Sequence, residues 1–208
     1  MSVEVIDCEQ GTEDWFKARL GIPTASRFAD VMAKGEGKTR ARYMHELVAE
    51  TLRGSAEQDT YTNAHMERGK EQESEARNLY ALLKDADPLL VGFLRNGRKG
   101  ASPDSLLGTD GGLEIKTALG HIQVERLQRG TLPPEHVAQV QGTLWVSERD
   151  WWDFMSYSPG LPPLIVRVSR DEDYIKTLAA AVDAFNDELD LIANSLRDPR
   201  DMFRKAAA

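Results

Sequence analysis

The order of helix-like and strand-like segments is the feature that most constrains how this chain can fold. Helical patterns with capping residues and glycine stops occupy residues 12–84. From residue 88 onward, short apolar segments alternate with turn signals, among them Asn96-Gly97, which predicts a hairpin. Helical patterns return between two later strand-like segments and again at the end of the chain. This order predicts an α/β fold with a mixed central sheet flanked by helices.

The 208 residues show no internal repeat and no low-complexity linker, so we expect a single domain over 1–208. Within it we distinguish a helical part at about 10–84, a core at about 88–173 and a last helix at about 173–197. No apolar run is long enough for a membrane span, and no secretory signal opens the chain. The one cysteine, Cys8, excludes an internal disulfide and a cysteine-ligated zinc or iron–sulfur site. We therefore expect a cytoplasmic protein.

Charge is distributed unevenly along the chain. The formal net charge is −8, which by itself argues against a polyanionic partner. Residues 17–42, however, hold seven basic and two acidic residues, so this segment carries +5 and the rest carries −13. A charge run is also typical of a solvated surface, and residues 171–190, at −6, fit that interpretation. We expect acids there, such as Asp183 and Glu188, to face solvent or a neighbouring copy. The basic residues are Lys17, Arg19, Arg27, Lys34, Lys38, Arg40 and Arg42.

Two carboxylates and one lysine are predicted to converge in the middle of the chain. Glu114 and Lys116 lie two residues apart on a predicted strand, so their side chains point to the same face while Ile115 points into the core. Asp104 lies on the preceding strand, after Pro103. A short turn that includes Asp110, Gly111 and Gly112 brings Asp104 beside Glu114.

Such a group of side chains has a chemical use. Neighbouring carboxylates repel each other, and a divalent cation relieves that repulsion. Oxygen ligands without histidine or cysteine favour Mg²⁺, or Mn²⁺, over zinc. A cation held there can polarise a phosphodiester and lower the pKa of a water molecule, while Lys116 offsets negative charge at phosphorus. The spacing taken alone is more typical of an exposed, salt-bridged strand face.

Four blocks of sequence carry a resemblance to a known family. They are QGTEDWFKARLGIPTASRF, MERGKEQESEAR, SPDSLLGTDGGLEIK and AQVQGTLWVSERDWWDFMSYSP. The third block is similar to the signature of the PD-(D/E)XK nuclease superfamily. Together, in this order, the blocks resemble the phage lambda exonuclease family, also called YqaJ-like viral recombinases. The resemblance implies a restriction-endonuclease-like core.

The resemblance also implies roles for residues near the predicted metal site. Asp104 and Glu114 match the metal-binding acids, with the carbonyl oxygen of Ile115 as a further ligand. Lys116 matches the catalytic lysine. Two more residues approach the same site in the family, Glu73 and Gln139. Gln139 and Gln141 point to different sides of a helix, so only one of them can face the metal. We expect two Mg²⁺ ions per site, with Mn²⁺ as a possible substitute.

Contacts with DNA are implied in the first two blocks. Arg19 and Ser26 match residues that bind the terminal 5′-phosphate, and Trp15 lies one helical turn before Arg19. Each also has a structural explanation: an ion pair for Arg19, a helix cap for Ser26 and core packing for Trp15. Met66 matches an apolar residue that wedges the strands apart, although helix packing explains it equally well. Four cations around glycines 35 and 37 are suited to the DNA backbone: Lys34, Lys38, Arg40 and Arg42.

The implied function is a Mg²⁺-dependent exonuclease acting on linear double-stranded DNA in the 5′→3′ direction. It would leave a 3′ overhang for a single-strand annealing recombinase, and it would form a homotrimeric ring. The expected setting is a bacterial host cell that carries a phage or prophage. Two alternatives stay open: a restriction-type or structure-specific endonuclease, and a catalytically inactive DNA-binding module. Asp104, Glu114 and Lys116 are all present, which argues against the second.

Overall fold

The computed structural model describes residues 2–33, 38–56 and 64–197, without the side chains of residues 64–70. Its first part contains β1 (Glu4–Ile6), α1 (Glu13–Ala18), the 3₁₀ helix η1 (Ala25–Arg27), α2 (Phe28–Met32), α3 (Lys38–Arg53) and α4 (Ala64–Lys84). Then follow β2 (Phe93–Arg95), β3 (Gly100–Ala101), β4 (Ser105–Leu107), β5 (Gly111–Thr117) and α5 (Gly120–Arg129). The last part contains η2 (Pro134–His136), α6 (Val137–Ser147), β6 (Trp151–Tyr157), β7 (Leu164–Ser169) and α7 (Glu172–Arg197).

Two sheets organise the strands. The larger sheet has the order β4-β5-β6-β7, in which β5 and β6 run parallel and the other pairs run antiparallel. The smaller sheet, β1-β2-β3, is antiparallel throughout and contains the hairpin predicted at Asn96-Gly97. The mixed α/β fold is thus confirmed. β1 escaped prediction because a strand of three residues is too short to establish an alternating pattern.

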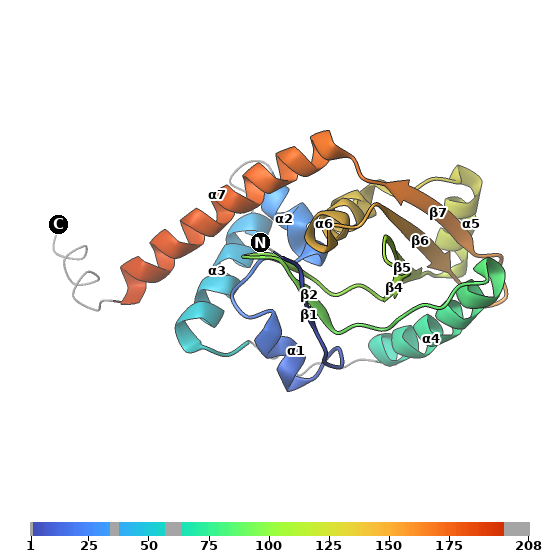
Figure 1. The fold of residues 1–208 in the computed structure, drawn as a ribbon, viewed down its shortest axis with the longest axis horizontal. Coiled ribbons are helices and arrows are strands. Elements are labelled where there is room, and N and C mark those ends of the chain that lie inside the picture. Colours follow the sequence, from blue (N-terminus) through green and yellow to red (C-terminus); the bar gives the residue numbers. More distant parts are fainter. Residues whose placement is uncertain (1, 34–37, 57–63, 198–208) are drawn as a thin grey trace.

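The larger sheet lies between α4 and α6, and this layering fixes the two faces of β5 (Figure 1). Leu113 and Ile115 pack toward α4, where they join a cluster with Tyr80. The alternate residues face the other side: in the neighbouring β6, Trp152 and Phe154 pack into the main core with residues of α6. Because side chains alternate along a strand, Glu114 and Lys116 also face α6.

The turn before β5 is shorter than the sequence predicts, because two glycines belong to the strand. The sequence suggests a turn that includes Gly111 and Gly112, but both residues pair with β6, opposite Trp151 and Trp152. A Cβ atom on Gly111 would lie 2.1 Å from the Trp151 ring, and one on Gly112 would lie 2.2 Å from the Trp152 ring. These glycines therefore admit large aromatic side chains on the adjacent strand, and the turn itself is confined to residues 108–110.

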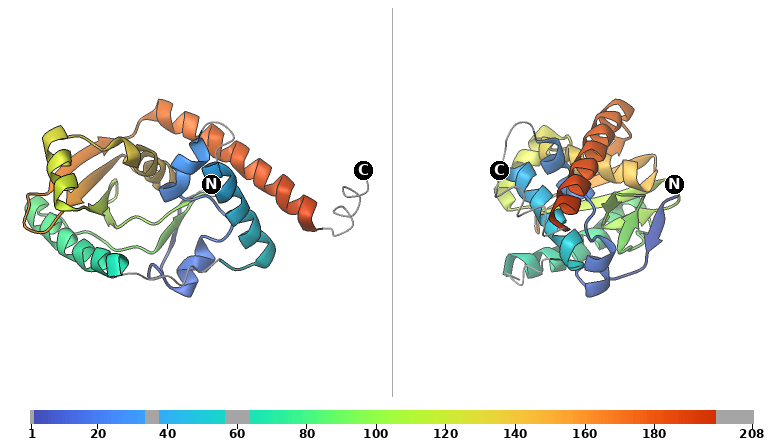
Figure 2. Two further views of the ribbon diagram at one scale, coloured as in Figure 1. Left: turned by 180° about the vertical axis from the view of Figure 1, so that it is seen from behind. Right: turned by 90° about the vertical axis from the view of Figure 1, so that its left-hand side faces the viewer.

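The last helix joins the N-terminal helices to the core. α7 runs along α2, α3 and α6, as the views in Figure 2 also show. It buries one apolar face that includes Leu178, Val182 and Phe185. Glu188 on this helix pairs with Arg40 of α3 at 2.7 Å. Within the described part of the chain, no helix is both long enough and apolar enough to span a membrane.

Candidate active site

One oxygen atom of Glu114 lies at the centre of the predicted site. Glu114 is buried on β5, and its Oε1 lies 2.5 Å from the Nζ of Lys116 on the same strand face. Gln139 of α6 donates from Nε2 to the same oxygen, also at 2.5 Å. Gln141 points elsewhere, to the carbonyl oxygen of Ser169 and the backbone N–H of Asp171. Of the two glutamines, Gln139 is thus the one that faces the site.

Asp104 reaches this site from the end of the neighbouring strand. It directly precedes β4, whose Ser105 pairs with Leu113 of β5. The Oδ2 atom of Asp104 accepts the backbone N–H of Ile115 at 2.6 Å. Burial raises the pKa of Asp104 well above its ordinary value, and the nearby carboxylates Glu114 and Glu73 raise it further. Asp104 is therefore a carboxyl group whose negative charge lacks sufficient compensation within the protein.

Lys116 supplies the positive charge of the site. Burial by itself would lower the pKa of Lys116, but the neighbouring Glu114 and Asp104 carboxylates more than offset it. The resulting pKa lies above the ordinary value for lysine, so the side chain stays protonated at neutral pH. A cation is thus held permanently beside the two acids.

Glu73 approaches the same group from α4 but has a partner of its own. Its Oε1 lies 2.5 Å from a guanidinium nitrogen of Arg77, one helical turn later. Arg77 also donates to the hydroxyl of Ser105 at 3.1 Å. Glu73 therefore raises the pKa of Asp104, while Arg77 fixes the position of the Glu73 side chain.

A pocket of about 240 Å³ connects these acids to the N-terminal helices, and Asp104, Glu114, Lys116 and Gln139 line it together with Arg19 and Ser26. The guanidinium group of Arg19 stacks on the ring of Trp15, 4.1 Å from the centroid, and donates to Thr24 at 3.3 Å. Trp15 donates to the hydroxyl of Ser102 at 2.8 Å. Trp15 thus lines the pocket and positions Arg19.

Ser26 lies in the middle of η1, where it is exposed to the pocket, and Thr24 occupies the capping position. The alternative role of Ser26 as a helix cap is therefore wrong. Its hydroxyl lies 3.4 Å from that of Thr24, which places two hydroxyl groups beside the Arg19 guanidinium. This end of the pocket offers donors to an anion.

Several pocket residues were missed from the sequence. Gln10 donates to the carbonyl oxygens of Val91 and Pro103, and thereby fixes the segment that precedes Asp104. Ser102 and Thr24 line the pocket as well. Ser102 lies within the quoted SPD motif, so its position beside Asp104 was a usable signal. The contacts of Gln10 join residues more than eighty positions apart, and no local pattern indicates them.

The remaining predicted DNA contacts do not line this pocket. Lys38 begins α3 and faces a second, larger cleft. Arg40 faces α7, where Glu188 and the ring of Phe185 engage its guanidinium. Lys34 lies outside the described residues. Met66 belongs to α4, but its side chain is outside the described part of the structure.

The donor set fits a hard divalent cation. The half-buried Asp104 and the buried Glu114 lie close together at the β4–β5 hairpin. Burial raises the pKa of Asp104, and repulsion from Glu114 raises it further. Among the described residues, no three His, Cys, Asp or Glu side chains are spaced to hold a metal ion. A site of two carboxylates and the Ile115 carbonyl leaves the other positions to water, as is usual for Mg²⁺.

Comparison with known proteins identifies the family. The family described as "YqaJ-like viral recombinase domain" matches residues 14–150, about two thirds of the chain. The chain belongs to the YqaJ-like viral recombinase family. The resemblance predicted from the four sequence blocks is thus confirmed. The matched residues include the predicted acids and lysine as well as Arg19, Ser26 and Gln139.

Solved structures agree with this assignment. The YqaJ-like chain is 37% identical to LHK-Exo, an alkaline exonuclease from Laribacter hongkongensis, with a TM-score of 0.82 over 94% of this chain and 98% of that chain. LHK-Exo in complex with dAMP matches with a TM-score of 0.83, at the same identity and coverage. A phage-related exonuclease from Haemophilus somnus 129PT shares the fold at 15% identity, with a TM-score of 0.62 over 84% of this chain and 96% of that chain. No curated protein sequence matches the chain.

Proposed function

We propose that this YqaJ-like protein is a Mg²⁺-dependent exonuclease that degrades one strand of linear double-stranded DNA from its 5′ end. One observation carries this proposal. A single oxygen atom of Glu114 contacts both Lys116 and Gln139, and the pKa of the neighbouring Asp104 is raised. This arrangement brings two acids, a protonated lysine and the Gln139 amide together in one pocket, which Arg19 also lines.

The general class of the enzyme follows from its relatives. At 37% identity over nearly all of both chains, the similarity to LHK-Exo identifies a hydrolase of the exonuclease class. The existence of a dAMP complex of LHK-Exo supports DNA as the substrate and a nucleotide as the product for this chain too. The 5′→3′ direction and the need for a metal ion go beyond that similarity.

Asp104, Glu114 and the carbonyl oxygen of Ile115 would hold the metal ion. When bound, Mg²⁺ polarises the scissile phosphodiester and makes a nearby water molecule more acidic. The backbone N–H of Ile115 keeps Asp104 directed toward the site. Gln139 holds the carboxylate of Glu114 from above the sheet and can also orient the attacking water through its amide oxygen.

Lys116 stabilises the charge that develops on the phosphorus centre. Its ammonium group is partly buried and stays protonated, so it offers a fixed positive charge that solvent screens less than at the surface. Arg19, assisted by the hydroxyl groups of Thr24 and Ser26, would bind the terminal 5′-phosphate in the same pocket. Contacts to both the terminal 5′-phosphate and the scissile phosphodiester would determine which phosphodiester bond lies beside the acids.

The wider DNA path and the assembly also belong to this proposal. The positive charge of residues 17–42 supports binding of the duplex backbone along the N-terminal helices. The 3′ overhang would pass to a single-strand annealing recombinase. The proposal also includes a homotrimeric ring around the DNA, a second metal ion and a wedge role for Met66, as the resemblance to the lambda exonuclease family implies.

Strand-labelled digestion of a linear duplex tests the proposal. We expect Mg²⁺ to support release of mononucleotides from the 5′ end, faster from a 5′-phosphate than from a 5′-hydroxyl, and EDTA to stop it. Asp104→Ala and Lys116→Ala should abolish cleavage with an unchanged circular dichroism spectrum. Cleavage of closed circular DNA would instead indicate an endonuclease, and full activity of either variant would contradict the mechanism.

A further inference from the structure

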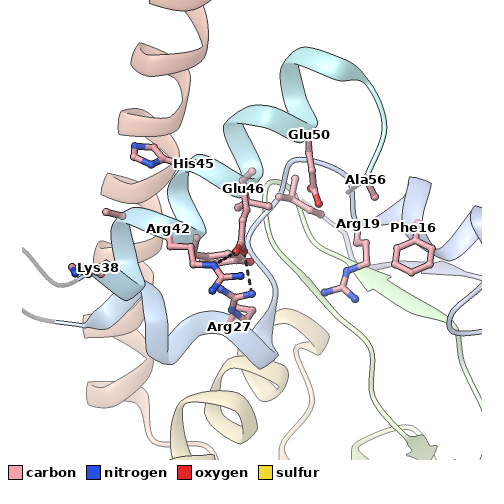
Figure 3. Close-up of a pocket in the computed structure, with 13 residues that line it drawn as sticks. Phe16, Arg19, Arg27, Lys38, Arg42, His45, Glu46, Glu50 and Ala56 are labelled. Carbon is pink, nitrogen blue, oxygen red and sulfur yellow. Dashed lines mark hydrogen bonds and ion pairs between the residues drawn. The ribbon is translucent and has the colours of Figure 1, made fainter. Parts of the chain in front are cut away.

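A second cleft lies behind the active-site pocket, between α1, η1 and α3. We call it the α1–α3 cleft; it has a volume of about 950 Å³ and is lined by Phe16, Arg19, Arg27, Lys38, Arg42 and Glu46, among others. Figure 3 shows Arg19 and Phe16 on one side of it, with Arg27 and Arg42 on the other. Its volume lies in the range of roughly 300–1,000 Å³ that is typical of ligand sites.

Two guanidinium groups of this cleft are held in place by one carboxylate. Glu46 lies 2.8 Å from Arg42 and 3.3 Å from Arg27. The guanidinium group of Arg27 also stacks on the ring of Tyr43, 4.2 Å from the centroid. Arg27 also pairs with Asp30, so these two guanidinium groups contact two acids between them. The described lining as a whole has more cations than acids, because Arg19 and Lys38 add to the cations and Glu50 is the only other acid in it. The cleft is therefore preorganised for anions such as phosphate groups.

Arg19 connects the α1–α3 cleft to the active-site pocket, because it lines both. Beside it, the backbone N–H of Thr24 donates to the hydroxyl of the buried Tyr43 at 3.1 Å. Thr24 thus faces the pocket that holds Asp104, while Tyr43 faces the cleft that holds Arg27. A strand that passes from the acids along Arg19 would continue into the cleft.

We propose that the α1–α3 cleft binds unpaired nucleotides on the 5′ side of the bond being cut, when the 5′ end of the duplex carries a short single-stranded extension. This inference rests on the proposed function, since it takes Asp104 and Glu114 as the cleavage centre. Arg19 then contacts an internal phosphodiester, and Arg27, Arg42 and Lys38 contact the phosphates beyond it. The ring of Phe16 offers a surface on which a base can stack.

The chemical step stays a hydrolysis. The oxygen of water bonds to phosphorus, and the bond from phosphorus to the 3′ oxygen of the extension breaks. The extension leaves as an oligonucleotide with a 3′-hydroxyl, and the 5′-phosphate stays on the duplex. The first product thus differs in length from that of a blunt end, which gives a mononucleotide.

Product length tests the inference directly. The wild-type enzyme is given a blunt 5′-phosphorylated duplex and the same duplex with three additional unpaired nucleotides at its 5′ end, both labelled at that end. We expect a labelled mononucleotide from the first and a labelled short oligonucleotide from the second. Mononucleotides alone from both substrates would overturn the cleft inference and leave the proposed function intact. No product from either substrate would overturn the proposed function itself.

Variants of the cleft supply a second test, measured as the rate on the extended duplex divided by the rate on the blunt duplex. Arg42→Ala and Arg27→Ala should each lower this ratio about tenfold, as expected for a lost charged hydrogen bond. Glu46→Gln should raise it, because it removes the competing acid. Arg129→Ala is the matched control, since Arg129 also pairs with a glutamate one helical turn away, on α5. An equal ratio in Arg42→Ala and Arg129→Ala would overturn the inference.

Inhibition by free dAMP tests whether the cleft binds an unpaired 5′ extension or the released mononucleotide. If the cleft held the released mononucleotide instead, excess dAMP would inhibit the wild-type enzyme, and Arg42→Ala would relieve that inhibition. This outcome would overturn the inference. We expect dAMP to inhibit the wild-type enzyme and Arg42→Ala equally.

Discussion

Lys116 and Gln139 converge on the same atom, Oε1 of Glu114, each at 2.5 Å. The first comes from the strand that also carries Glu114, and the second comes from α6 across the sheet. Gln139 thus fixes the orientation of the acid while Lys116 balances its charge. Gln139 is therefore a positioning residue, which would affect the reaction by orienting Glu114.

Gln139→Ala should lower kcat by about 10–100-fold with little change in stability, as is usual when a hydrogen-bonding partner of a metal ligand is lost. Gln141→Ala is the matched control on the same helix. Gln141 connects α6 to Ser169 and Asp171, so its loss should lower the free energy of unfolding and spare kcat. Steady-state kinetics and urea unfolding of both variants measure this; the same pattern in both would contradict the assignment.

Arg19→Ala should reduce the preference for a 5′-phosphorylated end. A charged hydrogen bond to phosphate contributes about 1.5–3 kcal/mol, so the rate on phosphorylated ends should fall roughly 10–100-fold. The rate on 5′-hydroxyl ends should change little. Equal losses on both ends would remove Arg19 from this role. Arg129→Ala, remote from the pocket, serves as the control.

Asp104→Asn should make the metal-free protein more stable and leave it inactive. In EDTA at alkaline pH the substitution removes repulsion from Glu114 and Glu73, and we expect a gain of roughly 1 kcal/mol, or about 2–4 °C in Tm. Mg²⁺ should then raise the Tm of the wild-type protein more than that of the variant. Thermal unfolding in EDTA and in Mg²⁺ decides this. A lower Tm for the variant in EDTA would contradict the role of charge repulsion.

His136 should make the fold sensitive to acid. Burial, together with the nearby cations Lys116 and Arg126, lowers the pKa of His136 from 6.5 to about 4. Between these values the unfolded chain takes up a proton that the folded protein does not bind, so stability falls as the pH drops from 6.5 toward 4. The full loss is about 3 kcal/mol.

His136→Gln should flatten this pH dependence, because glutamine keeps an acceptor for Arg126 and does not titrate in this range. Urea unfolding at several pH values between 4 and 7 measures the slope. His121→Gln, at an exposed position of α5, should leave the slope as in the wild type. Parallel curves for His136→Gln and the wild type would refute the assignment.

Gly142→Ala should destabilise the protein although alanine normally favours a helix. A Cβ atom at Gly142 would lie 2.3 Å from the ring of the buried Phe28, so α6 would have to move. We expect a loss of about 1–3 kcal/mol. Gly120→Ala is the control, because a Cβ atom there would lie 3.8 Å from Leu161, an ordinary contact. A stability equal to the wild type for Gly142→Ala would contradict the close packing of α6.

The parts of the site that follow from local periodicity could be predicted from the sequence. Alternation along a strand correctly separated Glu114 and Lys116 from Ile115. Helical periodicity likewise indicated that Gln139 and Gln141 could not share a role. The hairpin between β4 and β5 has a short connection, which is why the approach of Asp104 to Glu114 was predictable.

Contacts between distant segments could not be predicted in this way. Trp15 donates to Ser102 across 87 positions, and Arg40 pairs with Glu188 across 148. We expected Glu188 to face solvent or another copy, but it pairs within the chain while staying half-exposed. Such contacts depend on how layers pack, which neither composition nor periodicity encodes.

The position of α6 has a consequence for biosynthesis. Gln139 reaches Glu114 only when α6 is seated, and α6 is fixed through Gln141 to Ser169 and Asp171 and through packing against α7. These partners follow Asp104, Glu114 and Lys116 in the chain, so they are synthesised later. A nascent chain that already carries Asp104, Glu114 and Lys116 thus lacks the completed pocket. We therefore expect the complete site to form only after α7 has been synthesised.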